Sequence, residues 1–216
     1  MTDLRQATSW LLLGLLTVVG AGAAVLGVSQ APKNAPLQQA VDNTLAAPNF
    51  SQVITETTPQ AKRTDYLVWE APDKLGGYVQ SGDKRTYVYI IGSTEYQSLT
   101  VPAGTPSDHL VFYKQQSQAP AAAVDLTHHY LQFVKSATHV VQNGNTYAFS
   151  LTQGGQTGQF EVTVNGPYVS ELNLTVASAS VQLVISQVGT SPPVALPSGA
   201  KVIQAPTGLT PSTGGS

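Results

Sequence analysis

Cysteine is absent from this chain of 216 residues. Its absence excludes structural disulfides, thiol nucleophiles, Cys-ligated zinc and iron–sulfur clusters. It also excludes attachment to a membrane through a lipidated cysteine. Any membrane attachment must therefore be made by the polypeptide itself.

Charged side chains are also scarce. They make up 10% of the residues, against roughly 25% in average soluble proteins, and Gln, Thr, Ser and Asn carry the polar load. The formal net charge of -2 supplies neither the basic footprint of a nucleic-acid-binding protein nor a polybasic membrane patch. We therefore expect no nucleic-acid partner, and the uncharged polar surface suits an exported protein.

The chain lacks a recognisable catalytic or phosphate-binding motif. There is no G-x-S-x-G, no Ser-x-x-Lys at a helix start and no P-loop. His128 and His129 are adjacent on a predicted helix, so their side chains diverge by about 100° and do not share a metal easily. Asp125 and His129 have the i, i+4 spacing in which a carboxylate orients a base, but no nucleophile accompanies them. We predict a non-enzyme with no catalytic residues, no metal site and no cofactor, whose histidines are solvated or capping.

An apolar run from Trp10 to Val28 is interrupted by one polar side chain, Thr17. As a helix the run would be about 28 Å long, close to the roughly 30 Å hydrocarbon core of a bilayer. It predicts either an uncleaved single-pass anchor or a signal peptide, with the small residues 21–23 as a cleavage site. In both cases the rest of the chain is extracytoplasmic, held at the cell membrane or secreted after cleavage.

Between Asn143 and Val188, three segments alternate apolar and polar side chains. This period of two places each apolar set on one face of a strand. One-sided patterning favours an antiparallel sheet with one dry and one wet face. The apolar positions are Tyr147, Phe149 and Leu151, then Phe160, Val162 and Val164, then Leu172, Leu174 and Val176.

Turn residues recur every eight to twelve residues along the rest of the chain, which is the rhythm of an all-β sheet. Asn143-Gly144 is the strongest hairpin signal among them. Further strands are predicted at residues 50–57, 64–71, 75–81, 85–91, 94–99, 138–142 and 181–185, with a brief one at 110–113.

Two amphipathic helices are predicted beside these strands. Residues 37–46 carry one apolar stripe, and residues 121–137 form the stronger helix, with Leu126, Tyr130 and Phe133 on one face. The long connection at residues 100–118 predicts a loop or lid. The helices are the natural cover for the dry face of the sheet.

Together these patterns predict a mainly β (α+β) fold. About ten antiparallel strands are expected, covered by two or three helices and preceded by an apolar transmembrane or signal helix. The expected divisions are an anchor or signal segment at 1–29, a spacer at 30–36, one β domain at 37–204 and a disordered tail at 205–216.

Along the chain follow, in order, the predicted helix at 37–46, the segments YLVWEAPDK (66–74) and VYIIGSTEY (88–96), the predicted helix at 126–137, the Asn143-Gly144 hairpin and the closing VGTSPPV (188–194). This order resembles the LppX/LprG-type bacterial envelope lipoproteins and, more distantly, the LolA/LolB carriers. The resemblance covers residues 37–204 and departs from the family at the missing lipidated cysteine, which the apolar span replaces.

The resemblance implies a strongly curved half-barrel whose concave face, partly closed by helices, holds a lipid or a lipid anchor. It also implies a role as a lipid or lipoprotein carrier in the envelope. Without the resemblance, aromatic side chains on alternating strands are compatible with two states: an apolar cavity or an ordinary filled core. The residues predicted to line such a cavity are Leu67, Trp69, Tyr87, Tyr89, Tyr130, Phe133, Tyr147, Phe149, Phe160 and Val162.

The leading hypothesis from the sequence is therefore a membrane-tethered domain that binds a lipid or acyl chain. The alternative is a ligand-free surface domain with a filled core that binds a protein partner or senses a signal. The residues 85–91 bear on this choice, because Tyr87 and Tyr89 share one face of the strand while Val88 and Ile90 occupy the other. A strand apolar on both sides predicts cover on both sides.

Overall fold

The computed structural model describes residues 34–153 and 155–205. The predicted apolar helix at 10–28, most of the spacer at 30–36 and all of the predicted tail at 205–216 except Ala205 lie outside the described residues. Among the helices of the described ranges, none has the length and apolar character needed to cross a membrane. The anchor therefore stays a prediction.

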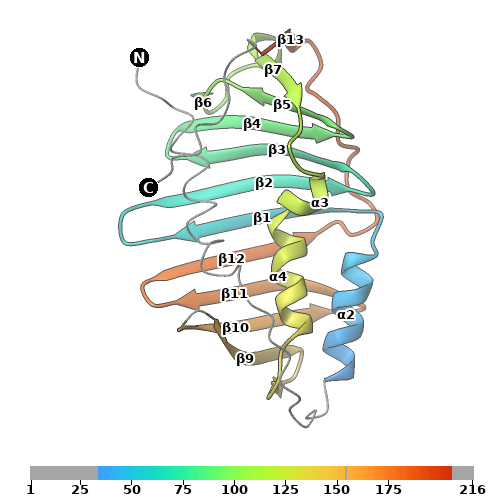
Figure 1. Ribbon diagram of the computed structural model, residues 1–216, viewed down its shortest axis with the longest axis vertical. Helices are drawn as coiled ribbons and strands as arrows, with labels where there is room; N and C mark the ends of the chain where they lie inside the picture. Colours follow the sequence, from blue (N-terminus) through green and yellow to red (C-terminus); the bar gives the residue numbers. More distant parts are fainter. Residues whose placement is uncertain (1–33, 154, 206–216) are drawn as a thin grey trace.

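One curved, unclosed sheet of 13 strands dominates the molecule, more than the ten or so expected (Figure 1). Its spatial order is β13-β7-β5-β4-β3-β2-β1-β12-β11-β10-β9-β8, with β6 paired to β4. The strands are β1 (Asn49–Thr57), β2 (Lys62–Glu70), β3 (Lys74–Ser81), β4 (Lys84–Ile91), β5 (Thr94–Ser98), β6 (Val101–Pro102), β7 (Val111–Gln116), β8 (Val141–Asn143), β9 (Thr146–Gln153), β10 (Gln156–Asn165), β11 (Tyr168–Val176), β12 (Ala179–Ser186) and β13 (Lys201–Gln204).

Short turns join most sequential strands, so nearly all neighbours are antiparallel, as predicted. The Asn143-Gly144 hairpin is confirmed: it joins β8 to β9, with Gly144 at a φ of 60°. The exception is β13, which pairs in parallel with β7. The sequence does not predict this C-terminal strand, because four residues after a Pro-rich segment are too few to show an alternating pattern.

The predicted loop at residues 100–118 is also wrong in large part. Its first half contains the short strand β6 and the 3-10 helix η1 (Ser107–His109), whereas its second half is β7, a full member of the sheet between β5 and β13. Leu110 and Phe112 are fully buried. Burial of these two side chains holds the segment in place, which rules out the whole of 100–118 acting as a lid.

Three helices are described, all on one face of the sheet in Figure 1. Helix α2 (Ala35–Leu45) confirms the first predicted helix. The second predicted helix is broken in two, α3 (Ala121–Val124) and α4 (Leu126–Lys135). The break falls at Asp125, whose backbone is extended (φ -78°, ψ 111°) and whose side chain accepts the N–H of His128. An Asp that caps a helix in this way competes with continuing the preceding one.

The main core lies between these helices and the sheet. Leu37 and Val41 from α2, and Leu131 and Val134 from α4, are fully buried against the strands. Helices α2 and α4 lie across the half of the sheet built from β1 and β9–β12 (Figure 1), whereas α3 contacts β3. The apolar stripes of α2 and α4 therefore pack on a largely apolar face of the sheet.

A second, smaller core lies on the opposite face of the other half of the sheet. It contains Tyr89, Phe112 and Val194, the last from the Pro-rich segment 189–200 that crosses this face. The Glu70 carboxylate accepts the N–H of Val194 at 2.7 Å, which fastens the segment to β2. Strand β4 is thus covered on both sides, as its two-sided apolar pattern predicted, with Ile90 in the main core.

Gly76 allows the close packing of this second core. A Cβ placed on Gly76 would lie 2.3 Å from Cδ1 of Tyr89 and 2.9 Å from Cγ1 of Val194. No side chain fits there while the tyrosine ring lies flat over the strand.

Candidate functional site

The face of the sheet beneath the helices is organised in rows of side chains that run across the strands. In an antiparallel sheet, residues directly opposite each other project to the same face. One row consists of Asp65, Ile54, Leu183, Leu172, Val162 and Tyr147, in the order β2, β1, β12, β11, β10, β9. The next row consists of Arg63, Glu56, Val181, Leu174, Phe160 and Phe149, over the same six strands.

Eight of the ten predicted cavity residues gather in this layer. Six are buried members of the main core, and Leu67 and Phe133 pack against it. The six are Trp69, Tyr130, Tyr147, Phe149, Phe160 and Val162.

Tyr87 and Tyr89 are not part of this layer. Both belong to the second core on the opposite face of the sheet. The register pairs Trp69 with Leu75 and Leu75 with Ile90, so Ile90 is the β4 residue that faces the helices. The ten residues therefore do not line one space, and a ligand contact for any of them stays a prediction.

The aromatic side chains of the layer are tightly associated. The rings of Phe149 and Phe160 stack with their centroids 5.0 Å apart and their planes within 6°. At the other side, Trp69 meets His128 edge-on at 4.5 Å, and Phe50 stacks on the same imidazole at 6.0 Å. The Trp69 Nε1–H is buried without a hydrogen-bond partner in the described part of the chain.

A buried polar network joins α4 to β1 at the centre of this layer. Gln52 Nε2 donates to Asp125 Oδ1 at 2.6 Å, and Thr127 Oγ1 donates to Gln52 Oε1. The other carboxylate oxygen, Asp125 Oδ2, lies 2.5 Å from Nδ1 of His128. Sequence reasoning singled out Asp125 with His129, whereas the structure pairs it with His128. The burial of Gln52 could have been predicted, because Gln52 alternates with Phe50 and Ile54 on the apolar face of its strand.

A second buried polar group lies at the β2 end of the row that runs from Arg63 to Phe149, which we call the Arg63 row. Arg63 donates from Nε and Nη2 to the two carboxylate oxygens of Asp65, each at 2.8 Å. Burial raises the pKa of Asp65, and the Arg63 charge opposes that rise. Burial likewise raises the pKa of Glu56, which lies opposite Arg63 on β1. Burial, and then the nearby Glu56 and Asp65 charges, raise the pKa of Tyr130 on α4.

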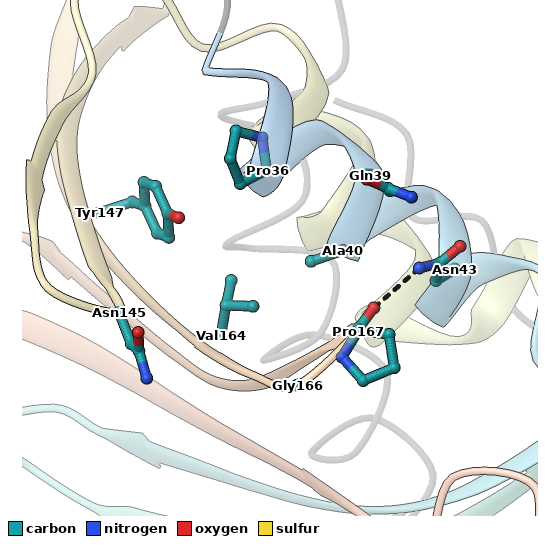
Figure 2. Close-up of a pocket in the computed structure, with 9 residues that line it drawn as sticks. All are labelled: Pro36, Gln39, Ala40, Asn43, Asn145, Tyr147, Val164, Gly166 and Pro167. Atoms are coloured by element: carbon teal, nitrogen blue, oxygen red, sulfur yellow. Dashed lines mark hydrogen bonds between the residues drawn. The ribbon is translucent and has the colours of Figure 1, made fainter.

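A pocket of about 500 Å³ opens between α2, the ends of β9 and β10, and the turn that follows β10 (Figure 2). Figure 2 shows Tyr147 and Val164 from the sheet facing Pro36 and Ala40 from the helix. Its volume lies within the range of small-molecule sites. The full lining is Pro36, Gln39, Ala40, Asn43, Asn145, Tyr147, Val164, Gly166 and Pro167.

One end of α2 is fastened beside this pocket. Asn43 Nδ2 donates to the Pro167 carbonyl at 3.0 Å, and Thr44 Oγ1 accepts the N–H of Val169 at 3.0 Å. Both contacts belong to the C-terminal half of the helix. The pocket therefore lies beside a helix whose C-terminal half is hydrogen-bonded to Pro167, in the turn between β10 and β11, and to Val169 of β11.

These features define a class of architecture: an open antiparallel sheet with helices across one apolar face. Solved structures with this arrangement include LprF from Mycobacterium bovis, at 11% sequence identity and a TM-score of 0.50, covering 80% of this chain and 100% of that one. The Mycobacterium tuberculosis lipoprotein LppX matches at 12% identity and a TM-score of 0.44, covering 76% of this chain and 97% of that one.

The resemblance predicted from the sequence is thus confirmed for the fold, because the match covers the whole of the LprF chain. No protein-family model matches the chain, and no curated protein matches it by sequence.

Proposed function

We propose that this protein is an extracytoplasmic domain that binds a lipid or acyl chain between its helices and its sheet. The segment Trp10 to Val28 tethers it to the cell membrane, or directs its secretion if it is cleaved. The domain at 37–204 acts without covalent chemistry, in lipid or lipoprotein trafficking within the envelope. The observation that carries the proposal is the apolar layer under two short helices, with the pocket beside Tyr147 at its margin.

The physical basis is the transfer of an acyl chain out of water. Burial of apolar surface is worth roughly 25 cal/mol per Å², so a long chain gains affinity without any specific polar contact. Helix α2 covers the pocket side of the layer, and separation of its N-terminal half from β9 and β10 would widen the pocket towards Tyr147 and Val162. Such a route leaves the hydrogen bonds of Asn43 and Thr44 in place.

The first test is native mass spectrometry of the full chain produced in a bacterial envelope, followed by organic extraction. A bound lipid or acyl species, released on unfolding, is the expected result. Phe149→Asp and Trp69→Asp each place a charge in the apolar layer and should abolish co-purification. Thr175→Asp, on the exposed face of β11, is the matched control. A folded Phe149→Asp variant that retains the lipid would remove Phe149 from the site.

One observation favours the alternative of a ligand-free interaction or sensing domain. Trp69, Phe149 and Phe160 are only 3%, 5% and 7% exposed beneath the protein's own helices, as in a filled core. That alternative predicts a clean unliganded mass and slow amide exchange in β2, β9 and β10. The lipid-binding function instead predicts that the extract contains lipid and that amide exchange in these strands becomes faster once the lipid is removed.

A further inference from the structure

The Arg63 row combines a polar head with a continuous apolar track. Arg63 and Glu56 stand at one end, and the row continues through Val181, Leu174 and Phe160 to Phe149. The four apolar side chains are 3–7% exposed. From Arg63 to Phe149 the row crosses five strand spacings of about 4.8 Å, about 24 Å, of which the four apolar residues cover three spacings, about 14 Å. One acyl chain spans roughly 15 Å of a 30 Å bilayer core, so the apolar part of the row, which the helices cover, has about the length of one chain.

Arg63 has an unused hydrogen-bond donor at the head of this track. The residue is 9% exposed, and Nε and Nη2 are taken by Asp65. Nη1 is buried with no partner in the described residues. A buried donor without an acceptor is unfavourable, and more so when the group is charged, so the position is suited to an acceptor supplied from outside the protein.

The charges around Nη1 select the kind of acceptor. The bidentate ion pair with Asp65 already balances the Arg63 charge. Glu56 lies directly opposite on β1 and would add a negative charge when ionised. A phosphate or a free carboxylate placed here would face that excess of negative charge, whereas an uncharged carbonyl oxygen needs only the donor.

We propose that Arg63 Nη1 binds the ester carbonyl of a neutral acyl lipid whose chain lies along Val181, Leu174, Phe160 and Phe149. This assignment rests on the proposed function, and it names both the ligand class and the residue that orients it. The ester group would lie beside Arg63 at the β2 end of the row, and the acyl chain would run from there towards Phe149.

The test compares three probes on the full chain in mild detergent, by competition in native mass spectrometry. They are dioleoylglycerol, its dioleyl ether analogue, which lacks both carbonyl groups, and oleate. The wild-type protein should bind the ester over the ether by about tenfold or more, the factor expected for one hydrogen bond from a charged donor. Oleate should bind more weakly than the ester.

The variant Arg63→Met/Asp65→Leu removes the donor without leaving Asp65 unpaired. Replacing a buried ion pair with apolar residues of similar size is often neutral or stabilising, so the fold should survive. The ester preference should fall to about onefold while ether binding is kept. Arg85→Met is the control. Arg85 lies over the Tyr78 ring and shares the face of β4 that carries Tyr87 and Tyr89, which is the face of the sheet away from the helices.

The outcomes separate the two hypotheses. Equal binding of ester and ether by the wild type, or an ester preference that survives in the double variant, would overturn the Arg63 assignment alone. Tightest binding of oleate would replace it with an anion site. Failure of the wild type to bind any of the three probes would reject the lipid-binding function, and the Arg63 assignment with it.

Discussion

Gln52 of β1 and Asp125 at the start of α4 are joined by a hydrogen bond of 2.6 Å between Nε2 and Oδ1. Neither side chain is more than 1% exposed. The bond fixes the point at which α4 begins over the sheet, because the same carboxylate also accepts the backbone N–H of His128. One carboxylate therefore both caps the helix and attaches it to the sheet.

Asp125→Ala should destabilise the protein by about 2–4 kcal/mol, because it removes a helix cap and leaves buried donors unpaired. Urea unfolding followed by circular dichroism measures the change. Asp42→Ala is the control, since Asp42 forms an exposed ion pair with Lys135 and such pairs contribute about 0–1 kcal/mol. Similar losses in the two variants would show that the buried network contributes little.

Gly76→Ala should cost about 1–3 kcal/mol through overpacking, because the added Cβ would meet the ring of Tyr89 at 2.3 Å. Thermal or urea unfolding gives the value. Combining it with Tyr89→Leu, which removes the ring atoms in the way, should cost less than the sum of the two single changes. Strict additivity would mean that β3 shifts away from Tyr89 instead.

Tyr89 should make the protein less stable as the pH rises above 10. Burial raises the pKa of Tyr89 to about 12, and the neighbouring Tyr87 adds to the rise. An unfolded tyrosine ionises near pH 10, so between pH 10 and 12 the unfolded chain has lost a proton that the folded one keeps. Stability then falls with pH across this window. Tyr89→Phe should flatten that fall in urea titrations at fixed pH; an unchanged slope would assign it to other groups.

Gln39→Trp should lower lipid loading several-fold if ligands enter beside α2. Gln39 is an exposed residue of α2 at the pocket (Figure 2). An indole at this position would occupy part of the 500 Å³ volume without disturbing the core. Thr175→Trp on the exposed face of β11 controls for added bulk. Loading that is unchanged in both variants would place the entrance elsewhere.

The strands could be predicted from the sequence because alternation and turn chemistry are local. Phe160, Val162 and their polar neighbours define β10 with no knowledge of its partners. The same alternation placed Tyr87 and Tyr89 on one face of β4 and Ile90 on the other. Which of the two sets shares a face with Trp69 depends on the register between β2, β3 and β4. Register is a relation between distant segments and was not available from one strand's pattern.

The errors share a physical cause, which is that tertiary contacts outweighed local signals. Pro102, Gly104 and Pro106 predicted a loop, yet burial of Leu110 and Phe112 holds the following residues in the sheet. The apolar stripe of 121–137 predicted one helix, yet the bonds of Asp125 to Gln52 and His128 favour a break. The Arg63 Nη1 donor, which has no partner among residues 34–153 and 155–205, could not be predicted, because its position depends on where Asp65 holds the guanidinium.

Two short strands terminate the large sheet. The outermost strands, β13 and β8, are four and three residues long, and Figure 1 places β13 at one end of the stack. A long free edge is a template on which a second molecule can add its own strand and start a growing aggregate. Because both outermost strands are brief, each of them offers only a few backbone groups on which a second copy could add a strand.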